Sequence, residues 1–117
     1  MEKKNIAIGI DIGGTSFKGA AIDREGHILH TFKMDVNKGD SQEKMMDDLL
    51  VALNKFLKEH GYNKDNVLGI GCGVPGVSNT KTGVVTYSNN LQWYETPIVK
   101  ILEEGTGLPV KIIVIIC

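Results

Sequence analysis

The feature that most constrains this chain is an apolar, β-branched segment that ends in a carboxylate, two glycines and a hydroxyl. Residues 6–10 (IAIGI) lead into Asp11-Ile12-Gly13-Gly14-Thr15, and Lys18 follows three residues later. This order predicts a buried strand whose end carries an acid beside a turn without bulky side chains. Glycine lets backbone N–H groups approach an anion because no Cβ blocks the way.

Two interpretations of this turn stay open. Thr15 adds a donor and Lys18 a point charge for a phosphate group, while Asp11 suits a hydrated magnesium ion, which proteins hold through few carboxylates. Gly-Gly between two strand-like segments is equally typical of a β-hairpin, and a hairpin whose turn binds phosphate would combine both. The segment matches neither the Walker motif nor the dinucleotide fingerprint.

Length, charge and cysteine spacing exclude several classes of protein. The 117 residues fit one domain, residues 1–117, and the net charge of −1 without a basic stripe argues against a nucleic-acid partner. The longest aliphatic run, residues 112–116, is far shorter than the ~20 residues of a membrane helix. Cys72 and Cys117 lack metal-site spacing, and the N-terminus lacks a signal peptide, so we expect a cytoplasmic protein.

Hydrophobic patterning predicts three strands and then a long helix. The strands cover residues 5–11, 17–23 and 27–34 and form a meander, with a turn at Gly26. The helix covers residues 40–60, with Asp40 as N-cap and Glu43 completing a capping box. Gly61 then stops the helix.

The remaining segments predict an α/β sheet. Residues 67–73 read as a strand beside the first one, and residues 83–87 as a short edge strand. Thr96 and Pro97 open a helix that runs to about residue 104 and is closed by Gly105 or Gly107. Residues 109–116 read as an aliphatic strand, which is buried on both faces if it is central. The order β-β-β-α-β-α-β predicts a mixed five-stranded sheet with a parallel core.

Two later loops contain residues suited to ligand binding. Pro75 and Gly76 end the glycine-rich strand in a rigid turn, which is also an ordinary type II turn. Asn89 and Asn90 can exchange hydrogen bonds with sugar hydroxyls, yet asparagine is equally a turn residue. Trp93 reads better as a core anchor than as a sugar-stacking ring.

Together these segments resemble the ROK family, which contains sugar kinases and sugar-responsive repressors. The resemblance runs from about residue 6 to residue 111 and is nearest to the glucokinase and fructokinase branch. It rests on five segments, in family order: DIGGT at 11–15 with Lys18, GIGCGVPG at 69–76, TGVV at 82–85, NLQW at 90–93 and GLPV at 107–110.

The resemblance implies a ribonuclease-H-like lobe of the actin-like ATPase fold, which pairs two such lobes around ATP and a sugar. It implies that Gly13, Gly14, Thr15 and Lys18 contact the ATP phosphates, with Asp11 near Mg²⁺. It also implies that Pro75, Gly76 and Asn90 border the sugar. In such kinases a sugar hydroxyl attacks the γ-phosphate while an aspartate takes its proton.

The chain departs from the family pattern after Lys111. The family continues there with a Glu-Asn-Asp motif whose aspartate is the base, whereas this chain continues with aliphatic residues to Cys117. We therefore assign no catalytic residue. The second lobe, with its adenine pocket, sugar-binding Glu and His and zinc site, is not part of these residues. The chain is expected to hold no zinc and to be inactive without that lobe.

Two alternatives follow from the same residues. A non-catalytic sugar- or phosphate-binding module could pair with itself or with another chain through a sheet edge or the interlobe face. A ROK repressor is the weaker alternative, because the first strand begins near residue 5 and leaves no room for a preceding helix-turn-helix.

Overall fold

The structure is a computed structural model that describes residues 4–37, 39–74, 77–79, 81–88 and 93–113. Its elements follow one another as β1 (Ile6–Ile12), β2 (Ser16–Ile22), β3 (Ile28–Asp35), α1 (Gln42–Glu59), β4 (Val67–Gly73), β5 (Val77–Asn79), β6 (Val84–Ser88), β7 (Trp93–Thr96), α2 (Ile98–Thr106) and β8 (Val110–Ile113). In the described residues no helix is long and apolar enough to cross a bilayer.

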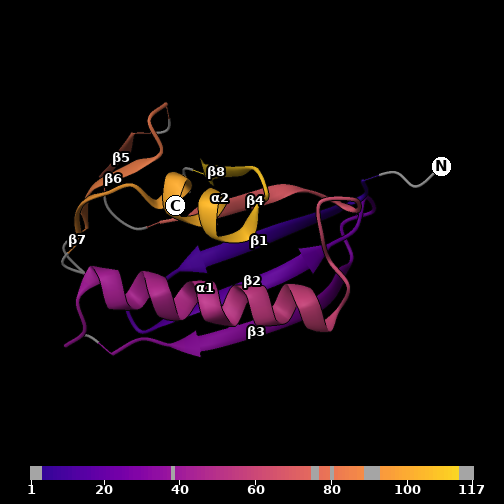
Figure 1. The fold of residues 1–117 in the computed structure, drawn as a ribbon, viewed down its shortest axis with the longest axis horizontal. Coiled ribbons are helices and arrows are strands. Elements are labelled where there is room, and N and C mark those ends of the chain that lie inside the picture. The colour runs from indigo at the N-terminus through magenta and orange to yellow at the C-terminus, as the bar shows by residue number, and fades with distance from the viewer. Residues whose placement is uncertain (1–3, 38, 75–76, 80, 89–92, 114–117) are drawn as a thin grey trace.

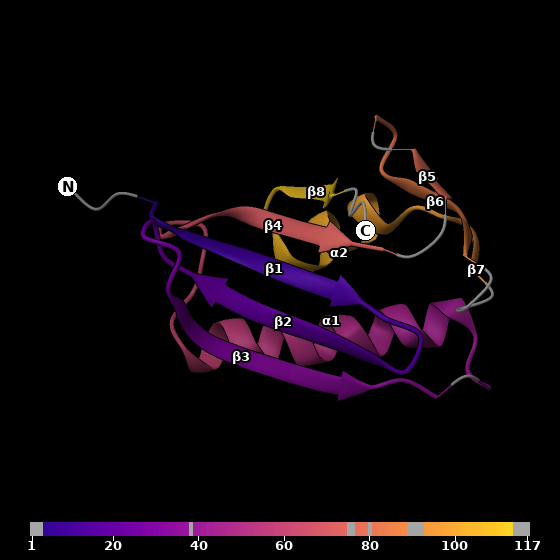
Figure 2. The same cartoon turned by 180° about the vertical axis from the view of Figure 1, so that it is seen from behind.

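A mixed five-stranded sheet organises the chain, as the sequence predicts. The strand order is β3-β2-β1-β4-β8. The first three strands are antiparallel neighbours, whereas β4 runs parallel to both β1 and β8. The carboxyl ends of β1 and β4 therefore meet at one edge of the sheet (Figure 2).

Both helices cover the same face of this sheet, α1 over the antiparallel half and α2 near β4 and β8 (Figure 1). The alternation in β1 explains this arrangement, because its four isoleucines are buried while Ala7, Gly9 and Asp11 point the other way. The largest fully buried side chains are Phe17, Ile8, Ile12, Leu49, Leu53, Ile98 and Leu102. We call the uncovered side the open face; its central residues are Gly9, Asp11, Lys18, Ala20, Gly71 and Gly73.

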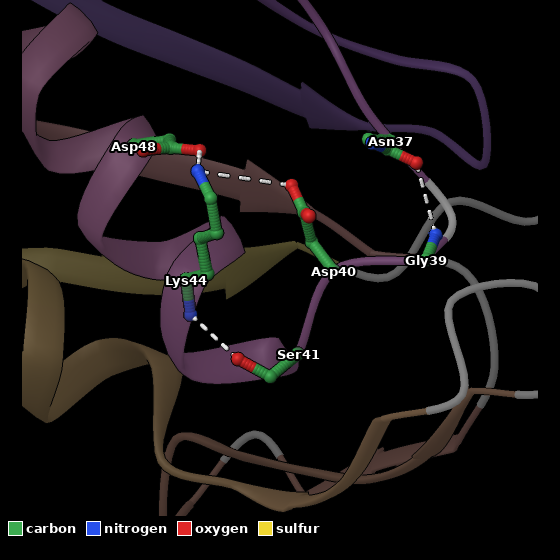
Figure 3. Close-up of polar contacts among 6 residues, drawn as sticks. All are labelled: Asn37, Gly39, Asp40, Ser41, Lys44 and Asp48. Carbon is green, nitrogen blue, oxygen red and sulfur yellow. Dashed lines mark hydrogen bonds and ion pairs between the residues drawn. The ribbon is translucent and has the colours of Figure 1, made fainter.

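The start of α1 corrects the predicted cap. Ser41, not Asp40, is the N-cap: its backbone is extended and its hydroxyl accepts from the Lys44 N–H at 3.1 Å (Figure 3). A serine oxygen reaches the amide three residues on, which leaves Asp40 outside the helix, with its carboxylate 3.8 Å from Lys44 Nζ. At the other end Gly61 takes a positive φ of 71°, which confirms the predicted stop.

A second sheet stands where the sequence predicts a single edge strand. Residues 84–88 are the centre of a three-stranded antiparallel sheet, β5-β6-β7. Thr96 ends β7 rather than capping α2, and Pro97 takes the cap position. Thr96 is buried and its hydroxyl donates to the Gln42 side-chain oxygen at 3.1 Å, so this sheet is anchored at the start of α1. Gly107, with φ of 76°, closes α2.

Within the described residues the last strand is an edge strand, so the condition for burial on both faces is not met. Within them β8 lies at the end of the strand order, paired only with β4. Ile112 packs under the helices, but half of the Ile113 side chain (51 %) is exposed on the open face. An aliphatic run fits one buried face of an edge strand as well as two faces of a central one, so hydrophobicity alone does not decide the position of this strand.

Candidate functional site

The first predicted binding segment folds as a hairpin turn between β1 and β2. Ile12 and Phe17 form the last cross-strand pair, and the Gly13 N–H donates to the Ser16 carbonyl at 3.0 Å. A Cβ on Gly13 would lie 2.9 Å from that carbonyl oxygen, closer than packing allows. Gly13 is therefore required by the turn itself, and its amide is used inside the protein.

The two residues at the tip of the turn have different surroundings. Among the residues that the structure describes, none accepts a hydrogen bond from the N–H of Gly14 or Thr15. Gly14 is half-buried and Thr15 is exposed. The Thr15 carbonyl accepts from the Val36 N–H at 3.0 Å, which fixes the turn against the end of β3. The tip thus presents two donors on an anchored backbone, as an anion site requires.

Asp11 and Lys18 are direct neighbours across β1 and β2, on the open face. On its other side Asp11 is in register with Gly73, the last residue of β4. Both side chains are exposed, so the carboxylate can keep the water shell that Mg²⁺ retains in proteins. The acid, the lysine and the hairpin tip therefore share the edge where β1 and β4 end, and ligands of open α/β sheets collect at such edges.

A shallow concavity of about 690 Å³ begins at this charged row. Asp11, Lys18 and Lys33 line one end, and the backbone of Gly9 and Gly71 forms its base. Lys33 was not predicted as a site residue. It belongs here because it is the cross-strand partner of Lys18. The strand register reveals this neighbour, whereas spacing in the sequence does not, since fourteen residues, including a turn, lie between the two.

The predicted sugar-side residues fall in segments that the structure does not describe. Pro75, Gly76 and Asn90 lie outside the described residues, as does the side chain of Trp93. The strand that leads to the first two, β4, does lie beside β1 as predicted. Their assignment stays a prediction.

A second group of ligand-type side chains is explained by a turn. Donor atoms of Asp23, Glu25 and His27 lie within 4.8 Å of one another. The Asp23 carboxylate accepts from the Glu25 and His27 N–H groups at 3.0 and 2.8 Å, which closes the turn at Gly26. The His27 backbone bond is the main cause that lowers the pKa of Asp23. This cluster has a structural role.

The buried thiol is unsuited to chemistry. Cys72 is free and buried under the helices, and this burial raises its pKa to about 12. Thiolates rather than thiols are nucleophiles and metal ligands, so Cys72 is a core residue.

The sheet order, the crossing helices and the glycine turn at the strand ends define the class: a lobe of the actin-like ATPase fold. The sequence model of the ROK family matches residues 7–114. A solved ROK family glucokinase from Streptomyces griseus, in complex with glucose and AMPPNP, superposes with a TM-score of 0.77 at 30% identity, over 92% of this chain and 32% of that one. This chain belongs to the ROK family.

Relatives in the family include kinases and regulators. A glucokinase of Halalkalibacterium halodurans is 35% identical over 103 residues, which are 88% of this chain and 31% of that protein. A putative xylose repressor of Caldicellulosiruptor sp. is 33% identical over 111 residues, 93% of this chain and 28% of that protein. The chain thus spans about a third of the length of these relatives.

Proposed function

We propose that this chain is the phosphate- and sugar-binding lobe of an ATP-dependent hexose kinase, and that it works in the cytoplasm together with a second lobe. The observation that carries the proposal is the hairpin tip, where the Gly14 and Thr15 N–H groups have no acceptor among the described residues. The glucokinase relatives and the glucose–AMPPNP complex of a family member support ATP and a hexose as ligands.

Each site residue has a separate role in this proposal. Gly14 and Thr15 donate to phosphate oxygens, and Lys18 adds positive charge across the strand pair. Asp11 holds Mg²⁺ through water, and the ion neutralises charge on the phosphates when bound. Phosphoryl transfer depends mainly on positioning and charge neutralisation, which this edge of the sheet can supply.

In this proposal the sugar and the proton acceptor are not held by the residues of the hairpin tip. Pro75, Gly76 and Asn90 border the sugar, and the base comes from outside this chain. General-base assistance contributes roughly 10²–10⁴-fold to a rate. We therefore expect the chain alone to bind nucleotide weakly and not to turn over.

A sugar-responsive regulator is the second candidate. It is favoured by the similarity to the putative xylose repressor, which covers as much of the chain as the kinase similarity does. In that case the sugar site would persist without phosphoryl transfer.

A chimaera separates these candidates. The glucokinase of Streptomyces coelicolor is 30% identical over 107 residues, so this chain can replace that segment. We expect the chimaera to phosphorylate glucose in a coupled assay, and Asp11→Ala to lower the rate on the order of a hundredfold. Asp47→Ala, an exposed acid on α1, is the matched control.

A chimaera that folds, as judged by its melting curve, yet binds glucose without turnover would favour the regulator. Turnover by the isolated chain at ordinary kinase rates would refute the need for a second lobe.

A further inference from the structure

The outer edge of β3 is a free strand edge within the residues that the structure describes. In that part of the chain β3 ends the strand order and pairs only with β2. In Figure 2 it forms the lower margin of the sheet, with α1 behind the strands. A strand edge carries a row of backbone N–H and C=O groups that can pair with another chain. This edge can therefore take up a further strand.

A groove of about 250 Å³ runs between this edge and α1. The rings of Phe32 and Phe56 meet in it with their centroids 4.8 Å apart, and His30 stacks on His60 at 3.8 Å. Two residues of a strand advance about 6.6 Å and four residues of a helix about 6 Å, so the two ring pairs are equally spaced on both elements. β3 and α1 therefore run in opposite directions and in step along the groove.

The charges beside this groove are complementary to themselves. Lys55 and Glu59 border it on the α1 side, as an exposed ion pair one turn apart at 3.8 Å. The centre of this pair falls at Leu57, next to Phe56, whose ring contacts Phe32. A two-fold axis through Phe32 therefore places Lys55 of one copy opposite Glu59 of the other, and the same contact forms a second time by symmetry.

The side chains of β3 also match when the strand pairs with a copy of itself. A bulge at the start of β3 leaves residues 30–35 as the regular segment, and Phe32 lies near its middle. Antiparallel pairing about Phe32 gives three kinds of opposite pair: Phe32 with Phe32, His30 with Met34, and Thr31 with Lys33. Aromatic and apolar cross-strand pairs stabilise a sheet, and this register opposes no like charges.

The same pairing brings the two copies of α1 side by side. In each copy α1 covers the antiparallel half of the sheet (Figure 1). A two-fold axis perpendicular to the sheet keeps both copies of α1 on one face. Neighbouring strands are about 4.8 Å apart, so helices over the outer strands of two joined sheets lie roughly 10–14 Å apart. Lysine and glutamate side chains are long enough to meet across that distance.

We infer that the outer edge of β3 is a self-association surface whose partner is a second copy of this chain. The two sheets join through antiparallel β3 strands into one continuous sheet, with Phe32 on the axis and Lys55 paired with Glu59 on both sides of it. Such an interface is isologous, as in most homodimers. It uses neither the hairpin tip nor the open face, so it does not depend on the proposed kinase role.

Charge reversal on α1 tests the inference, with analytical ultracentrifugation over a series of protein concentrations. Wild type should show a monomer–dimer equilibrium. Lys55→Glu and Glu59→Lys each put like charges across the axis and should each raise the dimer dissociation constant about tenfold. An equimolar mixture of these two variants should associate as wild type does, because opposite charges then face each other. Lys58→Glu makes the same charge change on the side of α1 towards the end of α2 and should change nothing.

Disulfide trapping locates the axis. In a Cys117→Ala background the remaining thiol, Cys72, is buried. Phe32→Cys should then give a cross-linked dimer, because each new thiol lies opposite its own copy. Met34→Cys should not, because its two thiols lie four residues apart along the paired strands, roughly 13 Å, which is too far for a disulfide.

Three results would overturn the inference. A chain that stays monomeric up to millimolar concentration has no such surface. Association that Lys55→Glu leaves unchanged, or that Lys58→Glu weakens equally, would use another part of the molecule. Cross-linking through Met34→Cys but not through Phe32→Cys would exclude the proposed axis. Melting curves of every variant establish that each one is folded, so a loss of association is not a loss of structure.

Discussion

At the scale of single residues, the two glycines of the hairpin turn, Gly13 and Gly14, differ in their hydrogen bonds. Gly13 is fixed by the turn, because its amide bonds to Ser16 and its missing Cβ makes room for that carbonyl. The N–H groups of Gly14 and Thr15 have no acceptor among the described residues, as the proposed phosphate site requires. The family resemblance implies that Gly13, Gly14 and Thr15 all contact the phosphates, whereas the hydrogen bonds use the Gly13 amide within the turn.

Cys72 gives a residue-scale prediction about alkaline stability. Because burial raises its pKa to about 12, the folded state keeps the thiol neutral where the unfolded chain ionises near pH 9. Its stabilising contribution is complete below about pH 9 and is lost as pH rises towards 12, by up to about 4 kcal/mol at 1.36 kcal/mol per unit.

The measurement is urea unfolding of wild type and Cys72→Ala at several pH values. We expect the gap between their free energies of unfolding to narrow as pH rises from 9 to 12. A constant gap would contradict the assignment of Cys72 as a buried, neutral core thiol.

At the scale of elements, the structure decides which of two neighbouring residues, Asp40 or Ser41, caps the start of α1. Ser41→Ala should lower the free energy of unfolding by about 1 kcal/mol, because an orphan helix amide loses its acceptor. Asp40→Ala should cost much less, since it removes only a long ion pair to a lysine whose side chain is exposed. Denaturant unfolding measures the free energy of unfolding of both variants. A larger decrease for Asp40→Ala than for Ser41→Ala would contradict the assignment of Ser41 as the N-cap and favour Asp40.

The edge position of β8 makes a second element-scale prediction. Ile112→Asp should destabilise by several kcal/mol, because it places a carboxylate among buried side chains. Ile113→Asp, one residue on, should stay within about 1 kcal/mol of wild type because that side chain is half exposed on the open face. Equal losses would mean that β8 is covered on both faces in the isolated chain.

These elements also show which parts of the fold and of the candidate site can be predicted from the sequence. Alternation in β1, the helical period of α1 and the glycine stops at 61 and 107 are local signals, so the five-stranded sheet and both helices were predicted. The strands β5 and β7 are short and depend on pairing with β6, which no local pattern reports. Lys33 joins the site only through the register of β3 against β2.

At the scale of the whole molecule, one face of the sheet carries the core and the other carries two of the proposed binding residues, Asp11 and Lys18. The helices bury the isoleucines of β1, while Gly9, Asp11, Lys18 and Gly71 remain on the open face. The fold brings Asp11, Lys18 and the hairpin tip to one edge of the sheet. This arrangement agrees with a lobe that closes on a nucleotide together with another lobe.

Titration of the isolated, isotope-labelled chain with Mg-ATP, followed by backbone amide NMR, tests the central claim most directly. The account predicts that the largest shift changes fall on the amides of Gly14 and Thr15, with the Gly26 turn unchanged as an internal control. Absence of change at the hairpin tip at millimolar nucleotide, or changes centred on another part of the chain, would contradict it.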